Sequence, residues 1–436
     1  MRPDWRTAPA PSGWEHCRLI DLMDLPQGQV DPRQEPYRSM VLVAPDHIES
    51  NTGRLIGKET AMQQGAISGK YTFRPGTVLY SKIRPYLRKA TLADFEGLCS
   101  ADMYPLCPQK DVTDPSFLLA LVLSEHFSRF AEIVSTRSGF PKINRQELAE
   151  YTTARPPLPE QRRMAEVLDT LDDTILKTEQ LIAKLKQMKQ GLLHDLLTRG
   201  INENGELRDS ERTPESFSES PIGRVPRDWQ FGILEHWLAG APKNGYSPQP
   251  VSKWTGRLML GLGCLTPEGF SPLQLKNAPK FDNRLRVASL RDGDFLLSRS
   301  NTRELVGLAG TYSDVGHPCF YPDLMMRLEP LAQRTSSRFM ELVLRSEPIR
   351  RQIQASASGT SGSMVKISGA IVRRLQVAFP PPAEQGRIMA VHQAASDRIA
   401  SEMIEHSKLR LLKQGLMDDL LTGRVRVTPP LVEPPP

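Results

Sequence analysis

Ten residues near the middle of the chain, KQGLLHDLLT at 189–198, return near its end as KQGLMDDLLT at 413–422, with eight of the ten positions identical. The likeness extends without a gap over 156–200 and 380–424, a constant offset of 224 residues. A repeat of this length indicates that one structural element is built twice. The fold must therefore find a place for two copies of the same segment.

Each copy has the signals of one long helix. A pair of prolines opens it, and Glu160 or Glu384 follows where the positive end of the helix dipole favours an acid. Gly200 and Gly423 stand where a helix C-terminus favours glycine. About 40 residues at 1.5 Å each would give a rod of roughly 60 Å.

Apolar residues recur at alternating intervals of four and three along the first copy, which is a heptad pattern. The stripe of the second copy is weaker, because His392, Glu402 and His406 interrupt it, and we place Met403 and Leu412 in that stripe. A rod this long cannot bury its own stripe, so the two copies are predicted to pair. The residues expected to mediate helix pairing and partner contact are Glu160, Gln161, Ile175, Leu185, Leu192, Leu196, Glu384, Gln385, Ile399, Leu409, Leu416 and Leu420.

The rest of the chain predicts two further domains. The 436 residues exceed one ordinary core, and 39% hydrophobic content excludes wholesale disorder. Short apolar runs between glycines and prolines predict two tandem α/β (α+β) domains. The expected order is domain 1–155, helix 156–200, linker 201–225, domain 226–379, helix 380–424 and disordered tail 425–436.

The two domains are related to each other in sequence. PSGW at 11–14 matches PRDW at 226–229, and RPGTVLYSK at 74–82 resembles RDGDFLLSR at 291–299. Lys142-Ile143 and Lys366-Ile367 keep the offset of the helices. The chain is therefore predicted to be domain, helix, domain, helix.

Catalytic signatures are missing. GRLIGKET at 53–60 is one residue too short between its glycines for a phosphate-binding loop, and no metal-ligand cluster or nucleophile motif is found. Five cysteines without a CxxC pair, no signal peptide and no long apolar run predict a cytoplasmic protein. We therefore expect neither catalytic nor metal-binding residues.

Basic stretches are the candidate functional feature. Arg74 to Ala90 contains five bases, no acid and two tyrosines, and the matching place in the second domain reads SRSNTRELVG at 298–307. Bases on a turn after a strand can reach phosphates and guanine edges; a solvated loop or a capped turn is the alternative. The candidate DNA-binding residues are Lys82, Arg84, Arg88, Lys89, Lys142, Arg299, Asn301, Arg303 and Lys366.

These features together resemble a type I restriction–modification DNA specificity subunit. The resemblance rests on Glu160-Gln161 and Glu384-Gln385 after prolines, on the KQGL…DLLT ends and on SPIGRVPRDW at 220–229, and it covers nearly the whole chain. It implies two target recognition domains held apart by an antiparallel coiled coil, each domain reading half of a bipartite asymmetric DNA site. The subunit would bind no cofactor itself.

The resemblance also implies partners. Two modification subunits would methylate adenine with S-adenosylmethionine, and motor–nuclease subunits would add ATP- and Mg²⁺-dependent cleavage. A specificity subunit of a methylation-only system is the alternative within the family. Outside it, a coiled-coil scaffold that binds proteins and a self-sufficient DNA enzyme remain, and the basic stretches and the missing catalytic motifs count against them.

Overall fold

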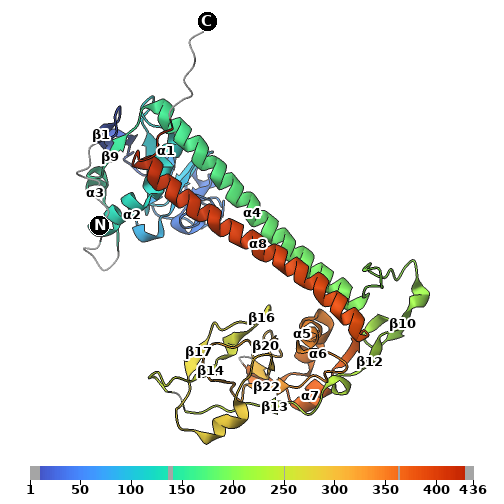
Figure 1. Ribbon diagram of the computed structural model, residues 1–436. Helices are drawn as coiled ribbons and strands as arrows, with labels where there is room; N and C mark the ends of the chain where they lie inside the picture. Colours follow the sequence, from blue (N-terminus) through green and yellow to red (C-terminus); the bar gives the residue numbers. More distant parts are fainter. Residues whose placement is uncertain (1–9, 136–140, 250, 362–363, 428–436) are drawn as a thin grey trace. The chain divides into compact units, whose positions relative to one another are not determined.

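The computed structural model describes residues 10–135, 141–249, 251–361 and 364–427. The chain divides into two compact units, residues 1–181 with 402–436 and residues 182–401. There are two long helices, α4 (Leu158–Thr198) and α8 (Pro382–Leu421) (Figure 1). Each of them is divided between the two units. The predicted fold class, two mixed α/β domains with two long helices in contact, is confirmed.

The first unit contains three small sheets, covered by helices. Asp114 caps the first of these helices, because its carboxylate accepts hydrogen bonds from two backbone amides of the first turn. The strand orders are β1 (Glu15–Arg18)–β9 (Thr152–Arg155), β2 (Met23–Asp24)–β8 (Met103–Pro108)–β5 (Val78–Ser81)–β6 (Ala90–Leu92) and β3 (Leu42–Val43)–β7 (Gly97–Cys99)–β4 (Tyr71–Phe73). The helices are α1 (Pro115–Leu123), α2 (Glu125–Ser135) and α3 (Arg145–Ala149).

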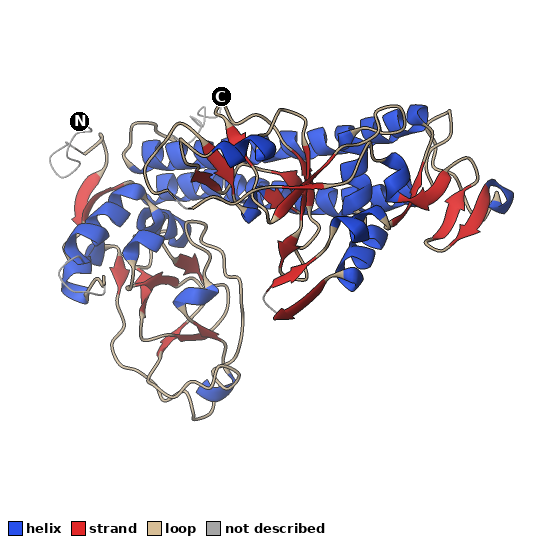
Figure 2. Ribbon diagram, turned by 90° about the horizontal axis from the view of Figure 1, so that it is seen from below, coloured by secondary structure: helices blue, strands red, loops and turns tan. Residues whose placement is uncertain are grey.

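The second unit repeats this plan, as the related sequences predict. Short strands alternate with helices in it as well, and Figure 2 distinguishes the two by colour. Its corresponding sheets are β12 (Gln230–Ile233)–β25 (Gln376–Phe379), β13 (Lys243–Asn244)–β22 (Met325–Leu328)–β18 (Phe295–Ser298)–β20 (Ala309–Thr311) and β17 (Leu275–Asn277)–β14 (Leu258–Leu260)–β21 (Cys319–Phe320). Short sheets are added by β10 (Phe217–Ser220), β11 (Gly223–Pro226), β15 (Leu265–Thr266), β16 (Gly269–Phe270), β19 (Ser300–Asn301), β23 (Ser358–Ser361) and β24 (Met364–Lys366). The helices are α5 (Ser337–Arg345), α6 (Glu347–Ser356) and α7 (Gly369–Arg373).

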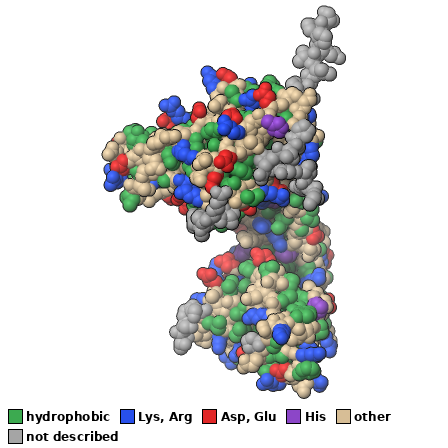
Figure 3. Space-filling model, turned by 90° about the vertical axis from the view of Figure 1, so that its left-hand side faces the viewer, with side chains coloured by type: hydrophobic (Ala, Val, Ile, Leu, Met, Phe, Trp, Pro, Cys, Tyr) green, Lys and Arg blue, Asp and Glu red, His purple; other side chains and the backbone are tan. Residues whose placement is uncertain are grey.

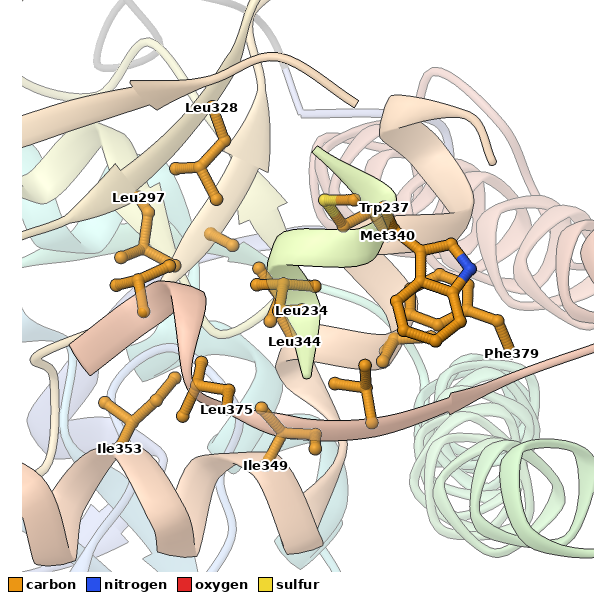
Figure 4. Close-up of a cluster of buried hydrophobic side chains, with 14 of the residues drawn as sticks. Leu234, Trp237, Leu297, Leu328, Met340, Leu344, Ile349, Ile353, Leu375 and Phe379 are labelled. Atoms are coloured by element: carbon orange, nitrogen blue, oxygen red, sulfur yellow. The ribbon is translucent and has the colours of Figure 1, made fainter. Parts of the chain in front are cut away.

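The main core of the second unit joins its sheets to both long helices. Trp237 stacks on Phe379 with ring centroids 4.7 Å apart, and side chains of α5 and α6 belong to the same buried cluster (Figure 4). Leu196 of α4 and Ile388 of α8 are fully buried in this same cluster. The helix pair is therefore part of the domain core, because its apolar stripe completes the hydrophobic interior.

The two long helices run antiparallel. Within the first unit, Lys413 of α8 pairs with Asp172 of α4 at 2.7 Å, and His406 with Glu179 at 2.9 Å. A step of seven residues toward the C-terminus of α4, from Asp172 to Glu179, therefore corresponds to a step of seven residues toward the N-terminus of α8, from Lys413 to His406.

The predicted stripe of α8 is wrong at two positions. Met403 and Leu412 are 49% and 55% exposed. The residues that are buried or half-buried instead follow one another at intervals of three and four, and some of them are polar. They are Ile399, Glu402, His406, Leu409, Lys413, Leu416 and Leu420. Hydrophobicity alone misplaces this seam because His406 and Lys413 face acids on α4.

The segment between α4 and the second domain, predicted as a linker, is structured. It contains the β10–β11 hairpin, and Ile201 forms a bridge with Leu207. Of the predicted tail, residues 428–436 lie outside the described part, whereas Arg426 is described and forms an ion pair with Glu160. None of the helices in the described ranges is both long and apolar enough to cross a membrane.

His392 of α8 gives the second unit a pH-sensitive position. It occupies the place of Leu168 in the first copy, and burial, with Lys189 and Arg345 nearby, lowers the pKa of its imidazole to about 4. Because the unfolded chain takes up this proton near pH 6.5 and the folded chain resists it down to about 4, stability falls as pH is lowered through that window.

We expect the His392→Leu variant to lose less stability than the parent protein as the pH is lowered from 7 to 4. Thermal melts of the second unit between pH 7 and pH 4 measure the effect, and His194→Leu, an exposed position of α4, is the matched control. A variant whose melting temperature falls with acid as steeply as that of the parent would contradict the assignment.

Candidate nucleic-acid interface

A buried carboxylate at the start of α4 connects the two ends of the first unit. Glu160 is 5% exposed and accepts a hydrogen bond from the Trp14 indole at 3.0 Å. Arg426, just after α8, donates to both of its oxygens at 2.6 and 2.8 Å. Gly423 has φ +68°, and a side chain there would collide with Pro11. The end of α8 is therefore seated against the beginning of the first domain.

The second unit has the same arrangement around Glu384, which is 2% exposed. The Trp229 indole donates to it at 3.2 Å, and Arg208 donates to both of its oxygens at 2.5 and 3.0 Å. The backbone amide of Ile201 adds a bond of 2.9 Å. Gly200, with φ +66°, lies where a side chain would meet Glu384. The end of α4 is thus seated against the beginning of the second domain.

These two junctions explain the repeated KQGL…DLLT ends. Leu196 shares a core cluster with Trp229, and Leu420 shares one with Trp14. The end of α4 therefore packs against the start of the second domain, and the end of α8 packs against the start of the first domain. Sequence reasoning assigned the glutamates to the helix dipole and missed their tryptophan and arginine partners. The matched P-x-x-W motifs at 11–14 and 226–229 were the sequence signal from which the tryptophan partners could have been predicted.

The glutamines next to these glutamates are also internal. Gln161 donates to the carbonyls of Pro156 and Val112 at 2.9 and 3.0 Å, and Gln385 donates to those of Pro380 and Arg334 at 2.9 and 2.7 Å. They are 0% and 4% exposed, which leaves almost no surface for a partner subunit. Of the other predicted pairing residues, Ile175 and Ile399 are buried, and Leu185, Leu192, Leu409 and Leu416 are half-buried.

In the first domain the predicted basic residues meet at one strand end. The Ile143 amide donates to the Lys82 carbonyl at 2.9 Å, and Lys142 pairs with Ile83 across a β-bridge. Arg84 has a left-handed backbone with φ +47°, and its amide bonds Pro141 at 2.9 Å. This backbone geometry brings the exposed side chains of Arg84 and Lys142 together on one loop surface.

Two other predicted bases point inward. Lys82 is 9% exposed, its ammonium lies 5.1 Å from the centre of the Tyr104 ring, and burial lowers its pKa. The Lys89 ammonium donates to the Pro45 carbonyl at 2.7 Å, and Arg88 is half-buried. These side chains support the loop, so Arg84 and Lys142 are the accessible members of the set.

The second domain repeats the same geometry. The Ile367 amide donates to the Arg299 carbonyl at 3.0 Å, and Lys366 pairs with Ser300. Lys366 is exposed. Arg299 is half-buried, with its guanidinium 3.4 Å from the Asp323 carbonyl.

Two further predicted residues lie at the end of β19 and on the turn that follows it. The Asn301 side chain accepts a hydrogen bond from the amide of the next residue, Thr302, at 2.9 Å. Arg303 donates to the Gln354 carbonyl at 2.8 Å and is otherwise exposed. On the face drawn in Figure 3, Lys and Arg side chains are interspersed with hydrophobic ones.

No group of three His, Cys, Asp or Glu within the described ranges could hold a metal ion. The two strand ends that present a lysine beside a basic turn are a second feature shared by both domains, besides the junctions at Glu160 and Glu384. Cationic donors on a fixed backbone can reach phosphates and base edges.

Comparison with known proteins agrees with this architecture. The model of the type I restriction modification DNA specificity domain matches residues 11–187. The EcoDI specificity subunit of Escherichia coli is 35% identical over 218 residues, about half the length of either chain. The MjaVIII specificity subunit of Methanocaldococcus jannaschii is 22% identical over 96% of this chain and 94% of its own.

Solved structures share the fold. The HsdS subunit from Thermoanaerobacter tengcongensis superposes with a TM-score of 0.50 at 19% identity, covering 96% of this chain and 99% of that one. A chain from a type I restriction–modification assembly gives 0.63 at 19% identity, covering 96% and 100%. Over residues 11–187 the chain is therefore similar to type I restriction–modification DNA specificity subunits, and over most of its length it shares their fold.

Proposed function

We propose that this chain reads a bipartite, asymmetric DNA site, one half with each domain. The observation that carries the proposal is the repeated strand end. In both domains an Ile amide bonds the carbonyl of a basic residue, which sets an exposed lysine, Lys142 or Lys366, beside the turn after the strand. Two readers with the same backbone and different side chains suit two different half-sequences.

The proposed partners are two modification subunits that use S-adenosylmethionine to methylate adenine in each half of the site. Motor–nuclease subunits that need ATP and Mg²⁺ complete the restriction form, and the cytoplasm is the proposed location. The relatives named as restriction enzyme specificity subunits support this assignment. A subunit that only recognises DNA needs basic side chains and no catalytic residues, because the partner subunits then carry out methylation and cleavage.

The direct test is to express this chain with its methyltransferase and map methylated adenines in the host DNA. We expect one motif of two fixed halves separated by a constant unread gap. A protein-binding scaffold would give no sequence-dependent methylation, and a single uninterrupted motif would contradict two separate readers. Challenge of the same cells with unmethylated DNA distinguishes a restriction system from one that only methylates.

Single arginine substitutions should affect one half of the motif. Arg84→Ala is expected to relax the sequence requirement in the half read by the first domain, and Arg303→Ala in the other half, each by about 1–3 kcal/mol if the guanidinium contacts a base. Methylation of a library of half-site variants measures this. Lys142→Ala and Lys366→Ala form a matched pair on the repeated strand ends. Equal weakening on all sequences would identify any of these side chains as a phosphate contact.

A further inference from the structure

One part of the second domain carries an unusual charge. Residues 243–291 contain eight Lys or Arg against Glu268 and Asp282, a net charge of +6 that equals the net charge of the whole chain. The corresponding stretch of the first domain, residues 26–74, has six bases against five acids, a net charge of +1. The excess positive charge is therefore concentrated on one lobe of one domain, which we call the 243–291 lobe.

Most bases of this lobe are not neutralised by neighbours. Ion pairs join Lys243 to Glu329 at 2.7 Å and Arg284 to Asp282 at 3.2 Å. Within the described part of the chain, no ion pair involves the six others, which are Lys253, Arg257, Lys276, Lys280, Arg286 and Arg291. In the first domain, by contrast, acids of the chain pair with Arg33, Arg54 and Lys58.

The same lobe exposes large apolar side chains. Phe281 is 91% exposed, Leu273 78%, Val287 68% and Trp254 57%. The large exposed hydrophobics of residues 26–74 are aliphatic or Met side chains, with no aromatic among those described. Apolar side chains at this exposure, set among bases without ion pairs, are typical of a surface that is covered by a partner.

The loop that carries Phe281 is tied down on both sides. Asp282 accepts hydrogen bonds from the Tyr246 hydroxyl and the Arg284 amide, each at 3.0 Å, and Arg284 lowers the pKa of its carboxyl. Ala278 before the tip and Leu285 after it are buried together in one small core cluster. Phe281 is therefore held outward by an ordered loop.

The segment that carries Trp254 lies beside this loop. The Asn277 side chain donates to the Ser252 carbonyl at 2.9 Å, and the Ala278 amide donates to the Arg257 carbonyl at 3.0 Å. The Lys280 ammonium lies 5.5 Å from the centre of the Phe281 ring. Aromatic rings and bases are thus gathered on neighbouring segments of the 243–291 lobe, which β14 and β17 form together (Figure 1).

We propose that the 243–291 lobe is a second DNA-contacting surface of this domain, on which bases hold the phosphates and Phe281 wedges against the base stack. The proposal rests on the proposed function. Charge complementarity selects the partner: a net charge of +6, with eight bases against two acids, fits a polyanion, and an apolar side chain held among cations is how proteins deform duplex DNA from its groove. Recognition of one half-site would then include the deformability of its sequence.

The test uses the full chain in complex with its methyltransferase and the duplex identified by methylation mapping. Duplexes carry 2-aminopurine at successive positions of the half-site read by the second domain. We expect binding of the parent complex to raise the fluorescence at one step, and Phe281→Ala to abolish that rise and weaken binding by about tenfold, within the range seen for base–aromatic contacts. Phe281→Leu should retain part of both effects.

Two further variants separate the contributions of charge and position. Lys280→Ala and Arg286→Ala should each lower the slope of log affinity against log salt by about one, because each removes one phosphate contact. Ile67→Ala, at a 76% exposed position of the first domain, is the control and should change neither quantity.

The outcomes distinguish this inference from the proposed function. Unchanged affinity and fluorescence in Phe281→Ala, with specific binding intact, would overturn the wedge alone. Loss of methyltransferase association in Phe281→Ala, measured by sedimentation without DNA, would overturn it in favour of a protein-binding surface. A parent complex without any sequence preference in binding would instead remove the proposed function.

Discussion

Replacing Glu384 with glutamine is expected to destabilise the second unit by about 3–5 kcal/mol, as breaking a buried ion pair does. The glutamate side chain is 2% exposed and that of Arg208 is 15% exposed, so the remaining guanidinium would stay largely buried with only the more exposed Asp228, at 2.8 Å, as its counterion. The Trp229 indole and the Ile201 amide would also lose the charge that accepts their hydrogen bonds. Urea unfolding followed by tryptophan fluorescence measures the change.

The internal repeat supplies the matched control for this experiment. Glu160→Gln removes the equivalent carboxylate in the first unit, but its partner Arg426 is 32% exposed and water can replace the lost charge. We therefore expect a smaller loss there. Glu219→Gln, which breaks a surface pair with Arg224 on the β10–β11 hairpin, should cost less than about 1 kcal/mol. Equal losses in all three variants would show that the buried carboxylates have no special structural role.

Under the proposed reading of a bipartite site, shortening both long helices together is expected to shorten the unread gap of the DNA site. The pairing of Lys413 with Asp172 and of His406 with Glu179 sets a register in the first unit, and the same residue numbering continued along the helices matches residues 182–188 of α4 to residues 397–403 of α8. Deleting both segments removes one heptad from each helix and preserves the phase of the seam. Seven residues at 1.5 Å are about 10 Å, or roughly three base pairs, and both half-sequences should be retained.

Methylation mapping of the double-deletion variant reads out the gap directly. Deletion of 182–188 alone is the control, because it leaves α8 longer than its partner and should reduce methylation at every site rather than shift the gap. An unchanged gap in the double deletion, or a change in the half-sequences themselves, would refute the role of the helices as a spacer.

The architecture could be predicted from the sequence because it depends on local periodicity and on repetition. Heptad spacing, the proline entries and the terminal glycines predicted the two long helices, and Gly200 and Gly423 do adopt the left-handed conformation expected after a helix. The shared offset of Lys142 and Lys366 predicted equivalent positions, and both lysines lie on the same backbone bridge. Such signals are carried by residues close together in the chain or repeated along it.

Only the tertiary structure decided which of these side chains face outward and which partners they meet. Lys82 and Lys89 belong to the same basic run as Arg84, yet they point into the domain. Glu160 receives Trp14 and Arg426 from segments 146 and 266 residues away. The physical reason is that burial and ion pairing depend on long-range contacts, which a one-dimensional pattern of charge and hydrophobicity does not contain.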